Sequence, residues 1–153
     1  IGGRECSPVF LHELHYLLLM GFSHSNRTIV RRTGALGLLP GQPKILEALT
    51  AYDGCTQKEL AQVCALDKST VTSVLSRMVA QGLVHKEACA DDRRAARIYL
   101  TKSGRQQAQA VAEIFHAVDA RALAGISEAD RAQFLRTFSA IIQNLNTLEG
   151  EET

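Results

Sequence analysis

Apolar positions follow a helical period over most of the chain and a strand period in one short stretch. Between Asp67 and Gly82 they recur at i, i+3, i+4, i+7 and i+8, which predicts a helix that buries one stripe of side chains. The predicted stripe consists of Val71, Val74, Leu75, Met78 and Val79. Asp67 is a favourable N-cap residue and Gly82 a common helix end, so the sequence marks both boundaries.

A shorter helix is predicted immediately before this one. Thr56 and Glu59 form a T-x-x-E capping box, in which two backbone donors at the helix start are satisfied reciprocally. The residues expected to face inward are Leu60, Ala61 and Val63. Residues 64–66, beginning with Cys64, form a turn that leads to Asp67. Two short helices joined in this way are typical of a helix-turn-helix.

A strand period replaces the helical one after Gly82. Residues 83–87 and 97–100 are predicted to form two antiparallel strands, joined by a loop at residues 88–96. The loop is rich in arginine. Two short helices followed by a strand pair with a basic tip predict a winged helix-turn-helix, which reads DNA by placing one helix in the major groove.

Amphipathic helices are predicted on both sides of this segment. One spans about residues 8–32, one follows the LPGQP turn, one runs from a cap at Thr101 to about residue 124, and one starts at Ser127. The apolar faces of the first and last helices are Phe10, Leu14, Leu17, Leu18, Phe22, Phe134, Leu135, Phe138, Ile141, Ile142 and Leu145. The helix that starts at Thr101 would be roughly 30 Å long. So small a body cannot cover it, and a partner is therefore expected.

The predicted fold class is mostly α with a small two- to three-stranded antiparallel wing. A hydrophobic fraction of 46% over 153 residues is sufficient for a packed core. The net charge is only +1, but residues 55–105 carry nine basic and five acidic side chains. The net charge of that segment is therefore +4 and that of the remaining residues is −3. This uneven distribution provides a positive face for phosphate binding. No apolar run approaches the roughly 18 residues of a membrane span, so no membrane partner is expected.

The polar face of the helix at residues 67–82 is the predicted DNA-reading surface. Its candidate contacts are Lys68, Ser69, Thr70, Thr72, Ser73 and Arg77. Small hydroxyl side chains allow close approach to the groove and can donate to phosphates or base edges, while Lys68 and Arg77 supply charge. In an isolated helix such a face would simply be solvated, but the preceding capped helix and the wing favour DNA contact.

The chain resembles the MarR family of bacterial transcriptional regulators over nearly its full length. The resemblance rests on Leu60-Ala61, the run STVTSVLSRMVAQGLV and the run DDRRAARIYLTKSG. It implies a homodimer whose first, fifth and sixth helices interlock, and two winged domains that bind a pseudo-palindromic operator in double-stranded DNA. Residues 1–36 are accordingly interpreted as an N-terminal dimerisation helix, 37–100 as the DNA-binding domain and 101–153 as C-terminal dimerisation helices.

The resemblance also assigns roles in the wing. Asp92 is expected to orient Arg94, which enters the minor groove, and Arg93 and Arg97 are expected to contact phosphates. One departure from the family is the Leu39-Pro40 pair, which stands where a polar N-cap is usual.

Family members often bind small aromatic or anionic molecules between the dimer body and the winged domain. On the first helix, His12, His15, Tyr16 and Arg27 could face such an effector. His12 and His15 also have an i, i+3 spacing that can hold a metal, but interface or pocket histidines are the favoured interpretation. No cofactor, metal site or catalytic constellation is expected.

The function expected from the sequence is a cytoplasmic, ligand-released repressor. One alternative is a thiol-based redox sensor that uses Cys6, because one branch of the family senses hydroperoxides through a cysteine near the first helix. Cys55 is expected to be a small buried apolar residue and Cys89 to be exposed on the wing. The other alternative is a winged protein-interaction module without DNA binding, which the basic wing disfavours.

Overall fold

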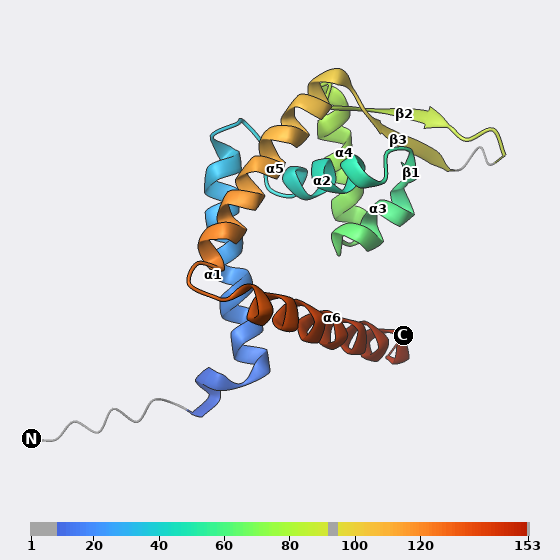
Figure 1. The fold of residues 1–153 in the computed structure, drawn as a ribbon. Coiled ribbons are helices and arrows are strands. Elements are labelled where there is room, and N and C mark those ends of the chain that lie inside the picture. Colours follow the sequence, from blue (N-terminus) through green and yellow to red (C-terminus); the bar gives the residue numbers. More distant parts are fainter. Residues whose placement is uncertain (1–8, 92–94, 153) are drawn as a thin grey trace, which may run out of the picture. The chain divides into compact units, whose positions relative to one another are not determined.

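The computed structural model describes residues 9–91 and 95–152. The chain divides into two compact units, with the boundary between Val118 and Asp119. The elements in chain order are η1 (Val9–His12), α1 (Leu14–Gly34), α2 (Gln42–Ala51), β1 (Cys55–Thr56), α3 (Gln57–Cys64), α4 (Lys68–Ala80), β2 (Val84–Ala88), β3 (Ala96–Leu100), α5 (Lys102–Ala122) and α6 (Glu128–Glu151) (Figure 1). The predicted fold class is confirmed, since helices dominate and the strands form a three-stranded antiparallel sheet of order β1-β3-β2.

The predicted first helix is interrupted near its start. A 3₁₀ turn at Val9–His12 precedes α1, and Glu13 between them has an extended backbone with φ −84° and ψ 149°. No side chain caps α1 at this end. Helical spacing of apolar residues carries no information about such a break, and the prediction of one continuous helix from residue 8 was wrong.

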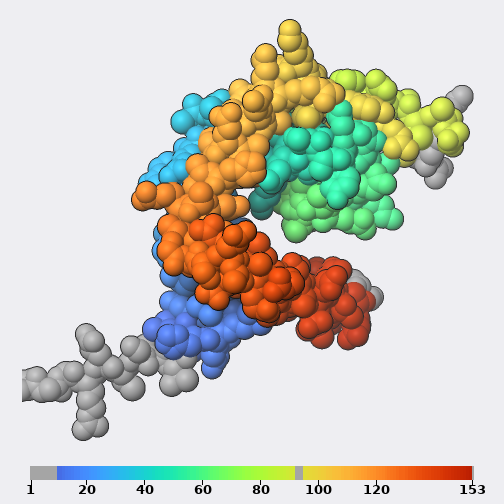
Figure 2. All heavy atoms as spheres, viewed as in Figure 1, coloured from blue at the N-terminus to red at the C-terminus, as the bar shows by residue number. Residues whose placement is uncertain are grey.

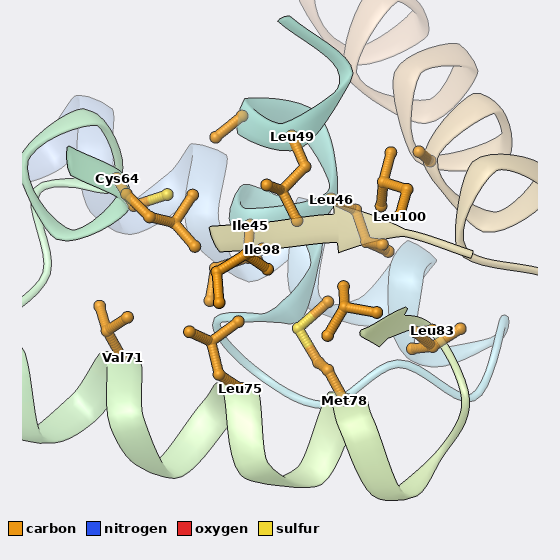
Figure 3. Close-up of a cluster of buried hydrophobic side chains, with 14 of the residues drawn as sticks. Ile45, Leu46, Leu49, Cys64, Val71, Leu75, Met78, Leu83, Ile98 and Leu100 are labelled. Atoms are coloured by element: carbon orange, nitrogen blue, oxygen red, sulfur yellow. The ribbon is translucent and has the colours of Figure 1, made fainter. Parts of the chain in front are cut away.

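The core of the first unit lies between α2, α4 and β3. Figure 3 shows Val71, Leu75 and Met78 of α4 pointing toward α2 and toward Ile98 of β3. The fully buried large side chains include Ile45, Leu46, Leu49, Leu60, Val71, Leu75, Met78 and Ile98. Each buried aliphatic side chain of this size contributes about 1.5–3 kcal/mol, so this cluster holds the helices of the winged domain together.

Two residues predicted to be buried are at the surface. Val63 is 52% exposed and Val79 is 42% exposed. The buried stripe of α3 runs through Leu60 and Cys64, so Val63 falls beside it. Cys64 itself, predicted to begin the turn, is the buried last residue of α3.

The wing is a ribbon in which Val84 pairs with Leu100 and Ala88 with Ala96. The ribbon extends beyond the helices of the winged domain (Figures 1 and 2). Thr101 ends it and starts α5, because its hydroxyl oxygen accepts the Gly104 amide at 3.0 Å. Gly104 is buried against the wing base, where a Cβ would overlap the carbonyl oxygen of Leu83.

The second unit consists mainly of α6. Ser127 caps it by accepting a hydrogen bond from the Asp130 amide at 3.1 Å, as the sequence predicts. No residue of α6 is buried. The large apolar side chains that it exposes are Phe134, Leu135, Ile142, Leu145 and Leu148. Within the described residues, no helix combines the length and the apolar character needed to cross a membrane.

Candidate nucleic-acid interface

Side-chain caps fix the starts of the two helices of the helix-turn-helix. The Thr56 hydroxyl accepts the Glu59 amide at 3.3 Å, and the Glu59 carboxylate accepts the Thr56 amide at 2.7 Å. The hydrogen bond from the Thr56 amide, followed by one from the Thr56 side chain to the same carboxylate, lowers the pKa of Glu59. Between the helices, Ala65 takes a left-handed conformation with φ 50°, which turns the chain sharply into α4.

The outer face of α4 carries the predicted polar side chains. Lys68, Ser69, Thr72, Ser73 and Arg77 are exposed, and Thr70 is half-buried. Their surface position follows from the burial of Val71, Leu75 and Met78 on the opposite side. The face is thus available to a ligand, and it bears two cations.

Asp67 organises the start of this face. Its Oδ1 accepts the Ser69 hydroxyl at 2.6 Å and the Thr70 amide at 2.8 Å, and its Oδ2 accepts the Thr70 hydroxyl at 2.7 Å. These bonds, led by that from Ser69, lower the pKa of Asp67 from 3.8 to about 2. The carboxylate is therefore ionised at neutral pH.

A groove of about 850 Å³ adjoins the first turn of α4. It is lined by residues of β1, α3, the turn after α3, the first turn of α4 and the start of β3, namely Thr56, Gln57, Lys58, Ala61, Gln62, Leu66, Lys68, Ala95 and Ala96. Most of this lining is apolar, and two lysines and two glutamines add cationic and hydrogen-bonding groups to it. Sequence reasoning chose Lys68 but missed Lys58, Gln57 and Gln62, although the capping box places all three on one short helix.

The wing residues are only partly described. Asp92, Arg93 and Arg94 lie outside the described residues. Arg97, predicted to contact a phosphate, donates from Nη1 to the carbonyl oxygen of Gly54 at 2.8 Å. This bond ties β3 to the turn before β1, and gives Arg97 a structural contact in the isolated chain.

The four residues predicted to bind an effector do not form one cluster. His15 lies 3.4 Å from the Glu13 carboxylate, and Tyr16 packs edge-on against Phe10 with ring centroids 5.2 Å apart. Arg27 lies about 16 Å farther along α1, where its Nε donates to the Ser23 carbonyl oxygen. The fourth candidate, His12, is the last residue of the 3₁₀ turn that precedes α1. Within the described ranges, no three His, Cys, Asp or Glu side chains come together as metal ligands.

The three described cysteines are buried or half-buried, and two of them have raised pKa values. Burial raises the pKa of Cys55, and burial also raises the pKa of Cys64 from 9.0 to about 11. Both thiols therefore stay protonated at neutral pH, which suppresses oxidation chemistry. Cys55 is half-buried against the core. Cys89, predicted to be exposed, is also half-buried. Cys6 lies outside the described residues.

Comparison with known proteins gives one consistent result. A profile of the MarR family matches residues 36–95. The solved structure of transcriptional regulator PA3341 is 30% identical with a TM-score of 0.79, covering 87% of this chain and 98% of that one. A MarR-family regulator from Silicibacter pomeroyi is 29% identical with a TM-score of 0.77, covering 85% of this chain and 88% of its own.

A third structure is more distant. Bordetella bronchiseptica BpsR, whose DNA binding is regulated by 6-hydroxynicotinic acid, is 20% identical with a TM-score of 0.75. The match covers 83% of this chain and 96% of BpsR, and at this identity it shows the fold alone. From the profile and the two more similar structures, the chain belongs to the MarR family of transcriptional regulators.

Proposed function

We propose that this protein is a sequence-specific DNA-binding regulator that acts as a homodimer on a pseudo-palindromic operator. The observation that carries the proposal is the exposed face of α4 with Lys68 and Arg77, adjoined by a groove with Lys58. In this arrangement α4 enters the major groove and the wing reaches the neighbouring minor groove. The DNA backbone that separates the major groove from the minor groove then lies along the protein groove that Lys58 and Lys68 line.

Regulation by a small molecule is the second part of the proposal. BpsR, which shares the fold, has its DNA binding regulated by an aromatic acid. A molecule of this class that binds between the dimer body and the winged domains would change the separation of the two α4 helices. These helices must match half-sites about 34 Å apart, so a ligand that favours another separation releases the DNA and relieves repression.

The proposed function is tested by selection from a pool of random DNA duplexes. The bound fraction is amplified through several rounds and sequenced. Enrichment of an inverted repeat with half-site centres about 10 base pairs apart is the expected result. A pool that stays random after repeated rounds contradicts sequence-specific binding.

A stable dimer is the first prediction. The α6 helix buries none of its residues and exposes Ile142 at 46%, so an apolar partner surface is required. Sedimentation velocity at micromolar concentration should show a dimer. We expect its interface to bury about 2,000 Å² or more of surface in total. Ile142→Glu should dissociate or unfold it, whereas the neighbouring Gln143→Glu should sediment as wild type. A folded wild-type monomer at this concentration would rule out the obligate dimer.

Lys68→Ala is predicted to weaken binding to selected and random duplexes alike. The Lys68 side chain lines the groove assigned to the DNA backbone, and a phosphate contact carries no sequence information. The slope of log K against log salt should fall by about 0.9 for each protomer that loses one contact. Fluorescence anisotropy at several salt concentrations measures this, with Lys102→Ala on α5 as the control. An unchanged slope for Lys68→Ala would remove Lys68 from the interface.

A further inference from the structure

Four hydroxyl groups on α4, those of Ser69, Thr70, Thr72 and Ser76, share one property. Each donates its proton to an oxygen of the chain itself. Ser69 and Thr70 donate to the Asp67 carboxylate, Thr72 donates to the Lys68 carbonyl oxygen at 2.8 Å, and Ser76 donates to the Thr72 carbonyl oxygen at 2.9 Å. A carboxylate and a carbonyl have no proton to give, so the direction of these bonds is fixed.

Asp67 fixes this direction most strongly. Its pKa of about 2 keeps it ionised, so both oxygens require donors. Near DNA this requirement increases, because a hydroxyl that turned its proton toward a phosphate would leave the Asp67 carboxylate facing another anion with one donor fewer. Ser69 and Thr70 are therefore held as acceptors toward anything that approaches the start of α4.

This direction decides what these hydroxyls can bind in DNA. Phosphate oxygens carry no protons, so a hydroxyl that only accepts cannot contact them. In the major groove the donors are the amino groups of adenine and cytosine, whereas guanine and thymine present acceptors at their N7, O6 and O4 atoms. The sequence-based expectation is that these hydroxyls donate to phosphates or base edges, whereas Ser69 and Thr70 in this arrangement can only accept.

We propose that Asp67 is a positioning residue that makes Ser69 and Thr70 select amino bases, adenine or cytosine, over the keto bases guanine and thymine at the positions they contact. The proposal rests on the proposed function, because it concerns how α4 reads its operator. Arg77 and Lys68 supply donors on the same face, so a contact to guanine falls to Arg77 and a contact to phosphate falls to Lys68.

Asp67→Asn separates this role from helix capping. Asparagine is an equally good N-cap, and its Oδ1 can still accept the Thr70 amide and the Ser69 hydroxyl. Its Nδ2 takes the place of Oδ2 and donates, so the Thr70 hydroxyl now accepts from it and is free to donate to DNA. Thr70→Val and Ser69→Ala remove one hydroxyl each with little change in shape.

The experiment compares base preferences of wild type and these three variants, selected from the same pool of random duplexes. Thr70→Val should lose an amino-base preference at one position of each half-site, and Ser69→Ala at another. At the DNA position read by Thr70, Asp67→Asn should change the preference from amino bases to keto bases. The relative affinity for the two kinds of base should shift by roughly fivefold, as expected for a single hydrogen bond. The base preference at the position read by Ser69 should stay unchanged. Circular dichroism melts check that each variant is folded.

Three outcomes would overturn the proposal. They are a keto-base preference at the hydroxyl-dependent positions, no altered position in either deletion variant, and identical preferences for wild type and folded Asp67→Asn. If Asp67→Asn does not fold, the two deletion variants still decide whether amino bases are read. If wild type itself enriches no sequence, the proposed function fails instead, so the two failures are distinguishable.

Discussion

Gly104→Ala is expected to lower the free energy of unfolding by about 3 kcal/mol or more. A Cβ at this position would overlap the carbonyl oxygen of Leu83, and Leu100 lies within contact distance on another side. The same carbonyl oxygen accepts hydrogen bonds from the amide and the hydroxyl of Thr101. The backbone at the base of the wing therefore cannot move away without breaking the start of α5.

Urea denaturation followed by circular dichroism measures this loss. Gly34→Ala is the matched control, because a Cβ at Gly34 would meet no atom within 4 Å and Gly34 also lies in a helix. Gly34→Ala should leave the free energy of unfolding unchanged or raise it slightly, since alanine has a higher helix propensity than glycine. Equal denaturation midpoints for Gly104→Ala and wild type would show that α5 and the wing base are not packed this closely.

Arg94→Ala should weaken binding to the selected operator by about 1–3 kcal/mol, the largest effect expected on DNA affinity. This prediction rests on the resemblance of the wing to the MarR family and on the minor-groove attraction for arginine. Asp92→Ala should cost less, because it removes only the partner that orients Arg94. Arg93→Ala is the comparison, since loss of a phosphate contact weakens random and selected duplexes equally.

Anisotropy titrations with both duplexes measure the three variants. Arg94→Ala should lose more affinity for the selected duplex than for the random one, with no change in the sedimentation of the dimer. Wild-type affinity in Arg94→Ala would mean that the wing does not touch DNA.

The starts of α3, α4 and α6 were predictable because their caps are local. Thr56, Asp67 and Ser127 each bond a backbone amide three residues ahead, so a short window of sequence contains the whole interaction. Burial at the edges of a stripe was not predictable. Val63 and Val79 have the spacing of core residues, but which side of a stripe is covered depends on neighbouring helices and strands.

The same distinction applies to the candidate site. The helical spacing of the buried residues of α4 also determines which of its residues face outward. The residues of the polar face could therefore be predicted from the sequence. The groove beside it could not, because it brings Lys58 of α3 and Ala95 before β3 together across nearly forty residues. The direction of the hydroxyl bonds at Asp67 also required the positions of the side chains.

The proposed function requires that α4 and the wing read a specific DNA sequence. The most direct test is a fluorescence anisotropy titration of wild-type protein with a duplex obtained by selection and with a scrambled duplex of the same length and composition, at one fixed salt concentration. The selected duplex is expected to bind at least about 10³-fold more tightly than the scrambled duplex. Equal affinity for the two duplexes would contradict it.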